Sequence, residues 1–120
     1  MIVKDDNIIA QGFNDQYPGS PKCVEVGCSG EELKIPSGTW IETCRAMHAE
    51  WWAITNARRV GNPTDLRDAT IYVNAEPCEV CAKIMTGLQA ETVVMLEGIY
   101  PTNGTQILRE AGINIRYVKL

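Results

Sequence analysis

Residues 69–96 decide the fold of this chain, and they read ATIYVNAEPCEVCAKIMTGLQAETVVML. Two β-prone runs, Ala69–Asn74 and Thr92–Leu96, stand at the ends of this stretch and predict strands. Between them, apolar side chains recur at helical spacing through Glu79–Leu88, and Pro77 is expected at the start of that helix. A strand, a helix and a second strand in this order indicate an α/β domain.

The alternation of helices and strands continues on both sides of this stretch. Upstream, we expect a central helix over Glu42–Val60, which Gly61-Asn62-Pro63 ends. A stripe of small side chains recurs along it at three- and four-residue spacing and lets it lie close against a sheet: Ala46, Ala49, Ala53 and Ala57. Downstream, we expect a helix over Thr105–Ala111 that closes on Gly112, and then a last strand over Ile113–Val118.

The N-terminal part combines a hairpin with a long irregular segment. Ile2–Lys4 and Ile8–Asn14 flank the turn-like residues Asp5-Asp6-Asn7 and are expected to pair. Asp15–Thr39 is rich in Gly, Pro and Ser and has no sustained period, which in a compact domain indicates a functional or metal-pinned loop. Together these elements predict one α/β domain with a mixed sheet over residues 1–120, without a separate regulatory module.

The balance of charged residues indicates which class of molecule the protein binds. Eleven Lys and Arg stand against 15 Asp and Glu, which gives a formal net charge of -4 and a sequence pI of about 4.9. Proteins that bind long nucleic acids usually carry a basic patch, and this sequence has no basic run. We therefore expect a small-molecule partner and no long nucleic acid, since a few Arg and Lys suffice for one phosphate group.

The sequence predicts neither a membrane span nor a secretory signal. No run approaches the ~20 apolar residues that cross a bilayer, and Met1–Asp6 lacks the charged-then-apolar layout of a secretory leader. Five cysteines are an odd number, and Cys78 and Cys81 form a C-x-x-C pair, which in a reducing compartment indicates metal or redox chemistry. The protein is therefore expected to be cytoplasmic.

Two short fragments together predict a catalytic zinc site. His48 and Glu50 form an H-x-E pair, and Pro77 precedes the pair formed by Cys78 and Cys81. This combination of H-x-E with P-C-x-x-C is the signature of zinc deaminases. Catalytic zinc takes three protein ligands and leaves a fourth position to water, so His48, Cys78 and Cys81 are the candidate ligands.

The spacing within each fragment has a physical reason. Cys78 and Cys81 stand three residues apart at a helix start, so they point to one side, and the helix N-terminus there favours the thiolate form. Glu50 lies two residues past a ligand, near the water without binding the metal, which suits a proton carrier. Alone, the cysteine pair is also typical of a redox site or half of a structural zinc site, but the sequence has no second C-x-x-C to complete four thiolates.

These motifs resemble the cytidine and deoxycytidylate deaminase superfamily, most closely its deoxycytidylate (dCMP) deaminase branch. The matching segments follow the order of that branch over nearly the whole chain: Ile2–Asp5, Ile8–Asn14, Cys23–Cys28, Ile35–Gly38, Cys44–Glu50 and Pro77–Lys83. The resemblance implies a three-layer α/β/α fold around a mixed sheet of roughly five strands, with bound Zn2+. It also implies a homo-oligomer that converts dCMP to dUMP by hydrolysis and releases ammonia.

The resemblance assigns two residues to substrate binding. It implies that Asn14 meets the sugar and that Arg59 helps to place the nucleotide. The chain departs from the branch at Trp52, where an Asn is usual. We expect Trp51 and Trp52 to pack in the core or at a subunit interface. The alternative role for these rings is stacking on the base. The chain also starts almost on the hairpin, so one face or edge of the sheet is expected to need cover from a partner subunit.

Other interpretations stay open at this point. Asn74-Ala75-Glu76 leans toward the Glu-Pro-Cys of purine and tRNA adenosine deaminases, so the substrate is alternatively another nucleoside, a free base or a purine. A non-catalytic binding subunit stabilised by zinc is a further alternative, although such a subunit would not need Glu50. Cys23, Cys28 and Cys44 are a candidate ligand set for a second, structural zinc. Alternatively, Cys44 is buried in the core and the other two are free loop thiols.

Overall fold

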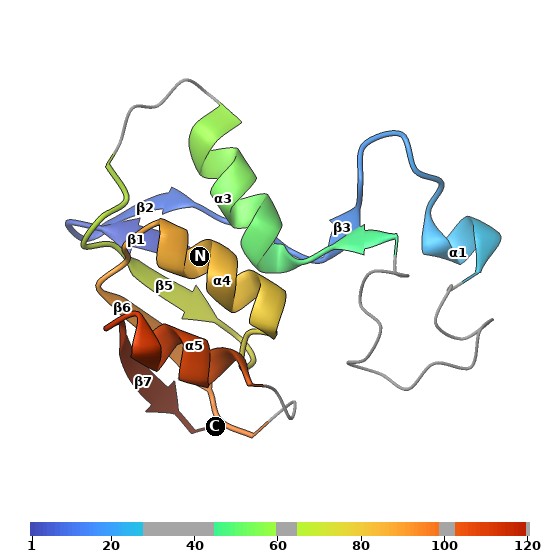
Figure 1. The fold of residues 1–120 in the computed structure, drawn as a ribbon. Helices are drawn as coiled ribbons and strands as arrows, with labels where there is room; N and C mark the ends of the chain where they lie inside the picture. Colours follow the sequence, from blue (N-terminus) through green and yellow to red (C-terminus); the bar gives the residue numbers. More distant parts are fainter. Residues whose placement is uncertain (28–44, 60–64, 99–102, 120) are drawn as a thin grey trace.

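The computed structural model describes residues 1–27, 45–59, 65–98 and 103–119 of the chain. Its main sheet has five strands in the order β2-β1-β5-β6-β7 (Figure 1). The strands are β1 (Ile2–Lys4), β2 (Asn7–Ala10), β5 (Thr70–Val73), β6 (Thr92–Leu96) and β7 (Asn114–Val118). β1 is antiparallel to both of its neighbours, whereas β5, β6 and β7 run parallel. The expected α/β class with a mixed sheet of five strands is confirmed.

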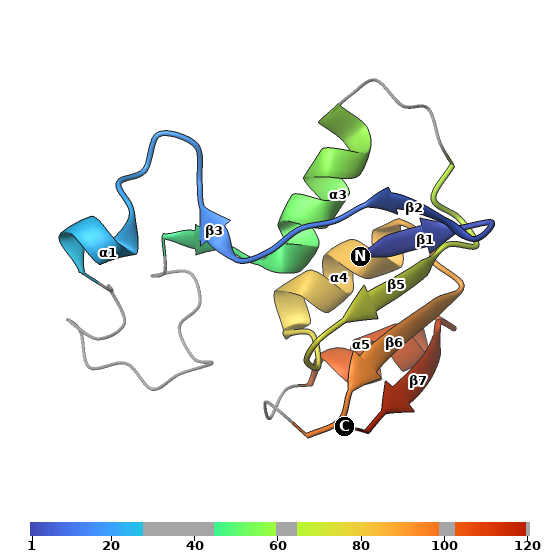
Figure 2. The same ribbon diagram turned by 180° about the vertical axis from the view of Figure 1, so that it is seen from behind.

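Three helices cover one face of this sheet. They are α3 (Ala49–Arg59), α4 (Glu79–Gly87) and α5 (Gly104–Glu110). All three lie in front of the strands in Figure 1 and behind them in Figure 2, which views the molecule from the opposite side. Buried side chains from both layers form one core cluster, which includes Ile71, Val93, Met95, Ala53, Met85 and Leu108. None of the described helices is long and apolar enough to cross a bilayer.

The opposite face of the sheet carries no helix among the described residues (Figure 2). Strand residues alternate between the two faces, so Val93 and Met95 belong to the core cluster whereas Val94 between them does not. Val94 is nevertheless only 4% exposed, and together with Tyr72 and Val118 it lines a groove on this open face. α3, α4 and α5 therefore form one layer, and the second helical layer of the expected three-layer arrangement is not found among the described residues.

Local sequence explains how neighbouring elements are joined. Asp5 and Asp6 have φ angles of 50° and 63°. Positive φ angles at both residues form the tight turn of a two-residue hairpin, and Asp tolerates this conformation better than most residues. After α5, Gly112 has a φ of 79° and donates to the carbonyl of Arg109, while Ile113 donates to the carbonyl of Leu108 at 3.0 Å. These two bonds form a Schellman cap, which ends α5 and leads directly into β7.

The central helix begins later than its sequence pattern predicts. Within the expected helix Glu42–Val60, Ala46–Met47 forms strand β4 and α3 starts only at Ala49. β4 pairs with β3 (Asp15–Gln16), and the Oδ1 of Asn14 accepts a hydrogen bond from the Ala49 N–H at 2.8 Å. A helix start needs such an acceptor, and here it comes from 35 residues earlier in the chain. The predicted start of the helix was therefore wrong.

The small sheet of β3 and β4 stands apart from the main sheet. Together with the short helix α1 (Cys23–Val26), it lies to one side, beyond the N-terminal end of α3, in both views (Figures 1 and 2). The described part of the segment that was expected to be irregular, Asp15–Thr39, thus contains β3 and α1. Residues 28–44 lie outside the described part.

A close contact fixes α5 against the turn that precedes α4. A Cβ atom on Gly104 would lie 2.1 Å from the carbonyl oxygen of Pro77 and 3.0 Å from that of Cys78. Both are backbone atoms, so the turn or the helix must move to admit a methyl group. We expect Gly104→Ala to lower the free energy of unfolding by about 1–3 kcal/mol, as overpacking does, and urea denaturation measures this change.

Gly87→Ala is the matched control for this substitution. Gly87 is the last residue of α4, and no atom lies within 4 Å of its Cβ position. Alanine is favoured over glycine in a helix by up to ~1 kcal/mol, so this variant is expected to match or exceed the parent in stability. Equal stability of Gly104→Ala and the parent would contradict a fixed contact between α5 and the turn.

Candidate active site

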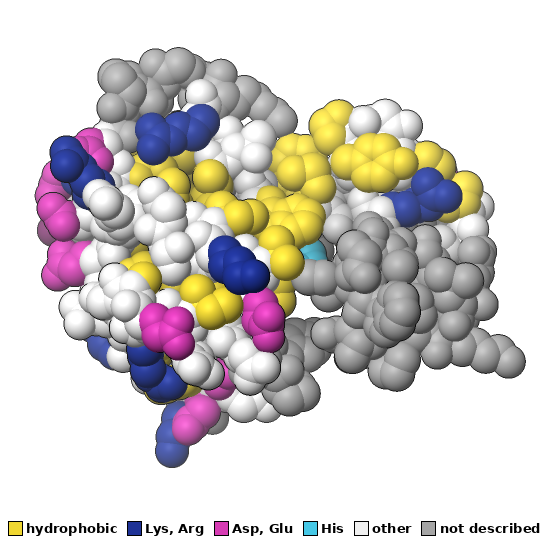
Figure 3. Space-filling model, in the orientation of Figure 1, with side chains coloured by type: hydrophobic (Ala, Val, Ile, Leu, Met, Phe, Trp, Pro, Cys, Tyr) yellow, Lys and Arg dark blue, Asp and Glu magenta, His cyan; other side chains and the backbone are white. Residues whose placement is uncertain are grey.

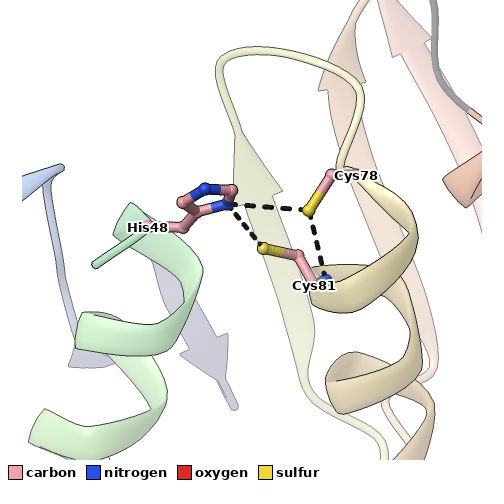
Figure 4. A group of neighbouring side chains, drawn as sticks. All are labelled: His48, Cys78 and Cys81. Carbon is pink, nitrogen blue, oxygen red and sulfur yellow. Dashed lines mark hydrogen bonds between the residues drawn. The ribbon is translucent and has the colours of Figure 1, made fainter. Parts of the chain in front are cut away.

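The N-terminal ends of α3 and α4 bring three metal-binding side chains together (Figure 4). His48 immediately precedes α3, Cys78 is the N-cap residue of α4, and Cys81 follows in its first turn. The Nδ1 of His48 is 3.1 Å from the Sγ of Cys81 and 3.6 Å from the Sγ of Cys78. One ligand atom from each residue lies within 4.8 Å of the others. The three predicted ligands thus form one group.

The start of α4 explains why the two sulfurs converge. Cys78 has an extended backbone with φ -69° and ψ 169°, and its Sγ accepts a hydrogen bond from the Cys81 N–H at 3.4 Å. The sulfur therefore supplies the helix cap. Pro77 was expected at the first helical position, but because Cys78 is the cap, Pro77 stands one residue outside the helix.

The donor set and its spacing fit zinc. Two thiolates and one imidazole are ligands that zinc takes in tetrahedral sites. Bonds of ~2.1 Å to nitrogen and ~2.3 Å to sulfur in a tetrahedron separate the two atoms by about 3.6 Å. The His48 nitrogen lies 3.6 Å from the Cys78 sulfur, which matches this value, and 3.1 Å from the Cys81 sulfur, which is shorter. Three protein donors leave one position open, as in catalytic zinc sites.

The three side chains change one another's protonation. The hydrogen bond that the Cys78 sulfur accepts from the Cys81 thiol lowers the pKa of Cys78 to about 4. The same hydrogen bond raises the pKa of Cys81. The hydrogen bond with Cys78 in turn raises the pKa of His48. These contacts favour the thiolate form of Cys78, and the thiolate is the form that binds a metal ion.

Glu50 connects this group to a cavity of about 350 Å3. After the hydrogen bond with Cys78 and burial, the nearby Glu50 carboxylate is a further cause of the raised pKa of Cys81. The same side chain lines the cavity, which lies between α3 and β5. His48, Cys78 and Cys81 do not line it. The Glu50 carboxylate thus lies between the metal-binding group and a space of the size that small-molecule sites have.

Asn14 reaches the same cavity from the segment that follows β2. Its Oδ1 is bonded to the Ala49 N–H, so its Nδ2 remains as a donor. Gly12 allows this segment to approach α3, because a Cβ there would lie 2.3 Å from the Ala49 carbonyl oxygen and 2.4 Å from the Ala53 nitrogen. The structure therefore brings the predicted sugar-binding residue into the cavity that Glu50 lines.

The two adjacent tryptophans make different contacts. The Trp51 ring stacks on the His48 ring and packs against the core cluster. The Nε1 of Trp52 donates to the Asp15 carbonyl at 3.1 Å. Neither indole lines the cavity. Packing is thus confirmed for Trp51, and the structure gives no support to base stacking by either ring. The i, i+3 spacing of His48 and Trp51 was the sequence signal for their contact.

The surface around the metal-binding group is apolar. Val80 and Ile84 on α4 are 43% and 39% exposed. In Figure 3, hydrophobic side chains gather beside the single histidine of the chain, while basic and acidic side chains are interspersed over the rest of the described surface on this face.

Three of the cavity residues were not among the predicted site residues: Phe13, Tyr72 and Asn74. Phe13 is 72% exposed. Tyr72 and Asn74 lie at the carboxyl end of β5, where ligands of α/β sheets commonly bind. That rule, applied to the predicted strand Ala69–Asn74, is the signal that was available in the sequence.

Some predicted site residues fall outside the described part. Arg59 is the last residue of α3, but its side chain is not described, and the same holds for Cys23 in α1. Cys28 and Cys44 both lie in the segment 28–44. The role of Arg59 and the second zinc therefore stay predictions.

The sequence also matches a family model, that of the cytidine and deoxycytidylate deaminase zinc-binding region, over residues 1–97. The chain belongs to this family. The match includes His48, Glu50, Cys78 and Cys81. Zinc is therefore the cofactor of this deaminase-family chain, because the family binds zinc and the His48, Cys78 and Cys81 side chains are placed to bind it.

Curated relatives of this deaminase-family chain are longer proteins. ComE operon protein 2 of Bacillus subtilis is 33% identical over an alignment of 121 positions, which covers 99% of this chain and 58% of that protein. Deoxycytidylate deaminase of Schizosaccharomyces pombe is 30% identical over 119 residues, which cover 97% of this chain and 35% of that protein. The chain thus spans less than two thirds of either relative.

Solved structures share the fold of this chain. The dCMP deaminase of cyanophage S-TIM5, in complex with dCMP and dUMP, superimposes with a TM-score of 0.75 and 19% sequence identity. The superposition covers 98% of this chain and 77% of the phage protein. At this identity the likeness concerns the fold, and it agrees with the mixed five-stranded sheet described above.

Proposed function

We propose that this chain deaminates a cytosine nucleotide by hydrolysis, converting dCMP to dUMP with release of ammonia. In this proposal His48, Cys78 and Cys81 hold a catalytic zinc and Glu50 carries protons. One observation carries the proposal: Glu50 lies near enough to Cys81 of the metal-binding group to help raise the pKa of that thiol, and it also lines the cavity. The deaminase names of several relatives support the choice of reaction.

The reaction adds water to C4 of the base and removes its amino group. When held by His48, Cys78 and Cys81, zinc would supply a nucleophile at neutral pH, because it lowers the pKa of water from 15.7 to about 7. Glu50 accepts a proton from the attacking water and delivers it to N3, the ring nitrogen next to C4. It then moves the proton of the new C4 hydroxyl group to the exocyclic nitrogen. The bond between C4 and this nitrogen breaks as the C4 carbonyl forms, so dCMP and water give dUMP and ammonia.

The cavity offers contacts for the rest of the nucleotide. The Nδ2 of Asn14 is a donor in the cavity, and we propose that it binds a sugar oxygen. Arg59 ends α3, and we propose that its guanidinium interacts with the phosphate. A nucleotide is therefore preferred over the nucleoside, because the phosphate adds a charged contact.

A substrate panel tests the proposed activity. We expect dCMP to be deaminated with a higher kcat/KM than deoxycytidine, cytosine or adenosine when ammonia release is measured for each compound. Adenosine represents the purine alternative that Glu76 beside Pro77 favours. Faster turnover of adenosine than of dCMP would replace the proposed substrate. Zinc-loaded protein that deaminates none of these compounds would favour the binding subunit instead.

Arg59→Ala tests the phosphate contact within the same panel. Its kcat/KM is expected to fall more for dCMP than for deoxycytidine, because deoxycytidine has no phosphate. Arg58→Ala is the matched control, since Arg58 is the preceding, exposed residue of α3. Equal losses on both substrates in Arg59→Ala would remove Arg59 from a phosphate-binding role.

We further propose that residues 1–120 act as one deaminase domain that assembles into a homo-oligomer. The groove along Val94 on the open face of the sheet is an apolar surface of the kind that a second copy covers. Cys23, Cys28 and Cys44 remain the proposed ligands of a second, structural zinc.

A further inference from the structure

The ring of Trp51 lies flat on the imidazole of His48. The two ring centroids are 4.7 Å apart and the ring planes differ by 10°. Trp51 follows His48 by three residues, in the first turn of α3, a spacing that places two side chains on the same side of a helix. The contact therefore joins Trp51, which lies within α3, to His48, which lies just before this helix.

Among the described residues, the imidazole of His48 has no partner of the kind that usually fixes a metal-binding histidine. Such a ring donates its second N–H to a carboxylate, a carbonyl or water, which sets its orientation. The Nδ1 of His48 faces the sulfurs of Cys78 and Cys81, and Nε2 makes no hydrogen bond with any described residue. The torsion that rotates the ring has broad minima, so another contact must select the angle at which Nδ1 meets the sulfurs.

The indole of Trp51 is itself held by packing. It contacts the core cluster, and its Nε1 is buried without a hydrogen-bond partner among the described residues. A buried unpaired N–H is unfavourable, and a leucine would pack here without that penalty. What the indole adds is a wide flat surface, and that surface lies against His48.

We propose that Trp51 is a positioning residue for zinc: its stacked ring holds the His48 imidazole at the angle that presents Nδ1 to the metal. Stacking thereby replaces the hydrogen bond that other zinc histidines make with their second nitrogen. This inference rests on the proposed role of His48 as a ligand. It concerns the affinity and geometry of the metal site and assigns Trp51 no contact with the substrate.

The binding of zinc and cobalt to the chain of 120 residues tests this role. Removal of the stacked ring in Trp51→Leu is expected to weaken zinc binding about 10-fold in chelator competition, the lower end of the range for residues that orient metal ligands. It is also expected to change the visible absorption of the Co2+-substituted protein, which reports ligand geometry. Trp51→Phe keeps a ring on His48 and is expected to retain most of the affinity and the parent's cobalt spectrum.

Two controls separate positioning from general stability. Trp52→Phe removes the neighbouring indole, whose Nε1 bonds to Asp15, and is expected to leave zinc affinity unchanged. In a His48→Cys background there is no imidazole to orient, so Trp51→Leu is expected to have no effect on zinc affinity there. An equal loss in both backgrounds would assign Trp51 a merely structural role.

The outcomes distinguish this inference from the proposed metal site. Trp51→Leu that binds zinc as tightly as the parent, with the same cobalt spectrum, would overturn the positioning role. If Trp51→Leu does not fold, Trp51→Phe and Trp51→Met decide, because the proposal requires tighter zinc binding in the phenylalanine variant. If the parent and His48→Ala bind zinc equally, the assignment of His48 fails, and this inference fails with it for that separate reason.

Discussion

Glu50→Gln is expected to lower kcat for dCMP by on the order of 10²–10⁴ or more while the protein still folds and binds zinc. Loss of general acid–base catalysis alone typically accounts for this range. The glutamine keeps the size of the side chain that lines the cavity beside the metal-binding group, but it cannot accept the proton that the reaction must move. Steady-state kinetics of ammonia release measure the effect, and elemental analysis verifies that zinc is retained.

Glu79→Gln is the matched control. Glu79 is also an acidic residue in the first turn of a helix at this site, and its Oε1 accepts a hydrogen bond from Asn103 at 3.2 Å. It does not line the cavity, so its loss is expected to change kcat little. A Glu50→Gln protein with near-normal kcat would remove Glu50 from the mechanism, whereas a loss accompanied by loss of zinc would point to a structural role.

The metal-binding group could be predicted from the sequence because its geometry depends on two local patterns. The C-x-x-C spacing at a helix start determines that Cys78 and Cys81 face the same side, and H-x-E ties His48 to Glu50. The strands were predictable for a similar reason, since β6 spans Thr92–Leu96 as its β-branched run indicates.

The start of α3 could not be read from the chain around it. Periodic alanines extend back to Ala46, and that pattern favours a helix, yet Ala46–Met47 pairs with β3 and Asn14 caps the helix at Ala49. Both partners come from a distant segment, and such long-range contacts override local propensity. The same holds for the placement of α3, α4 and α5 on one face of the sheet. The alternation of Val93 and Val94 gives both faces apolar residues, and it does not indicate what covers each face.

His48→Ala is expected to lose the catalytic zinc and, with it, the stability that zinc adds. A bound metal stabilises the folded state by an amount that grows with its concentration over Kd, about 2.7 kcal/mol at 100 times Kd. His48 joins the start of α3 to the start of α4 through the two sulfurs, so its removal also releases one helix from the other. Thermal unfolding with zinc or with a chelator measures this stabilisation, which we expect to be large in the parent and small in the variant.

The zinc count of the parent and the variant adds a second test of the same assignment. If Cys23, Cys28 and Cys44 bind a structural zinc, the parent is expected to hold two ions per chain and His48→Ala one. If they do not, the counts are one and none. In both cases the substitution removes one ion, because two sulfurs without the imidazole leave a site short of the three protein ligands of catalytic zinc. A His48→Ala protein with the parent's zinc content and the parent's response to chelator would exclude His48 from the ligand set.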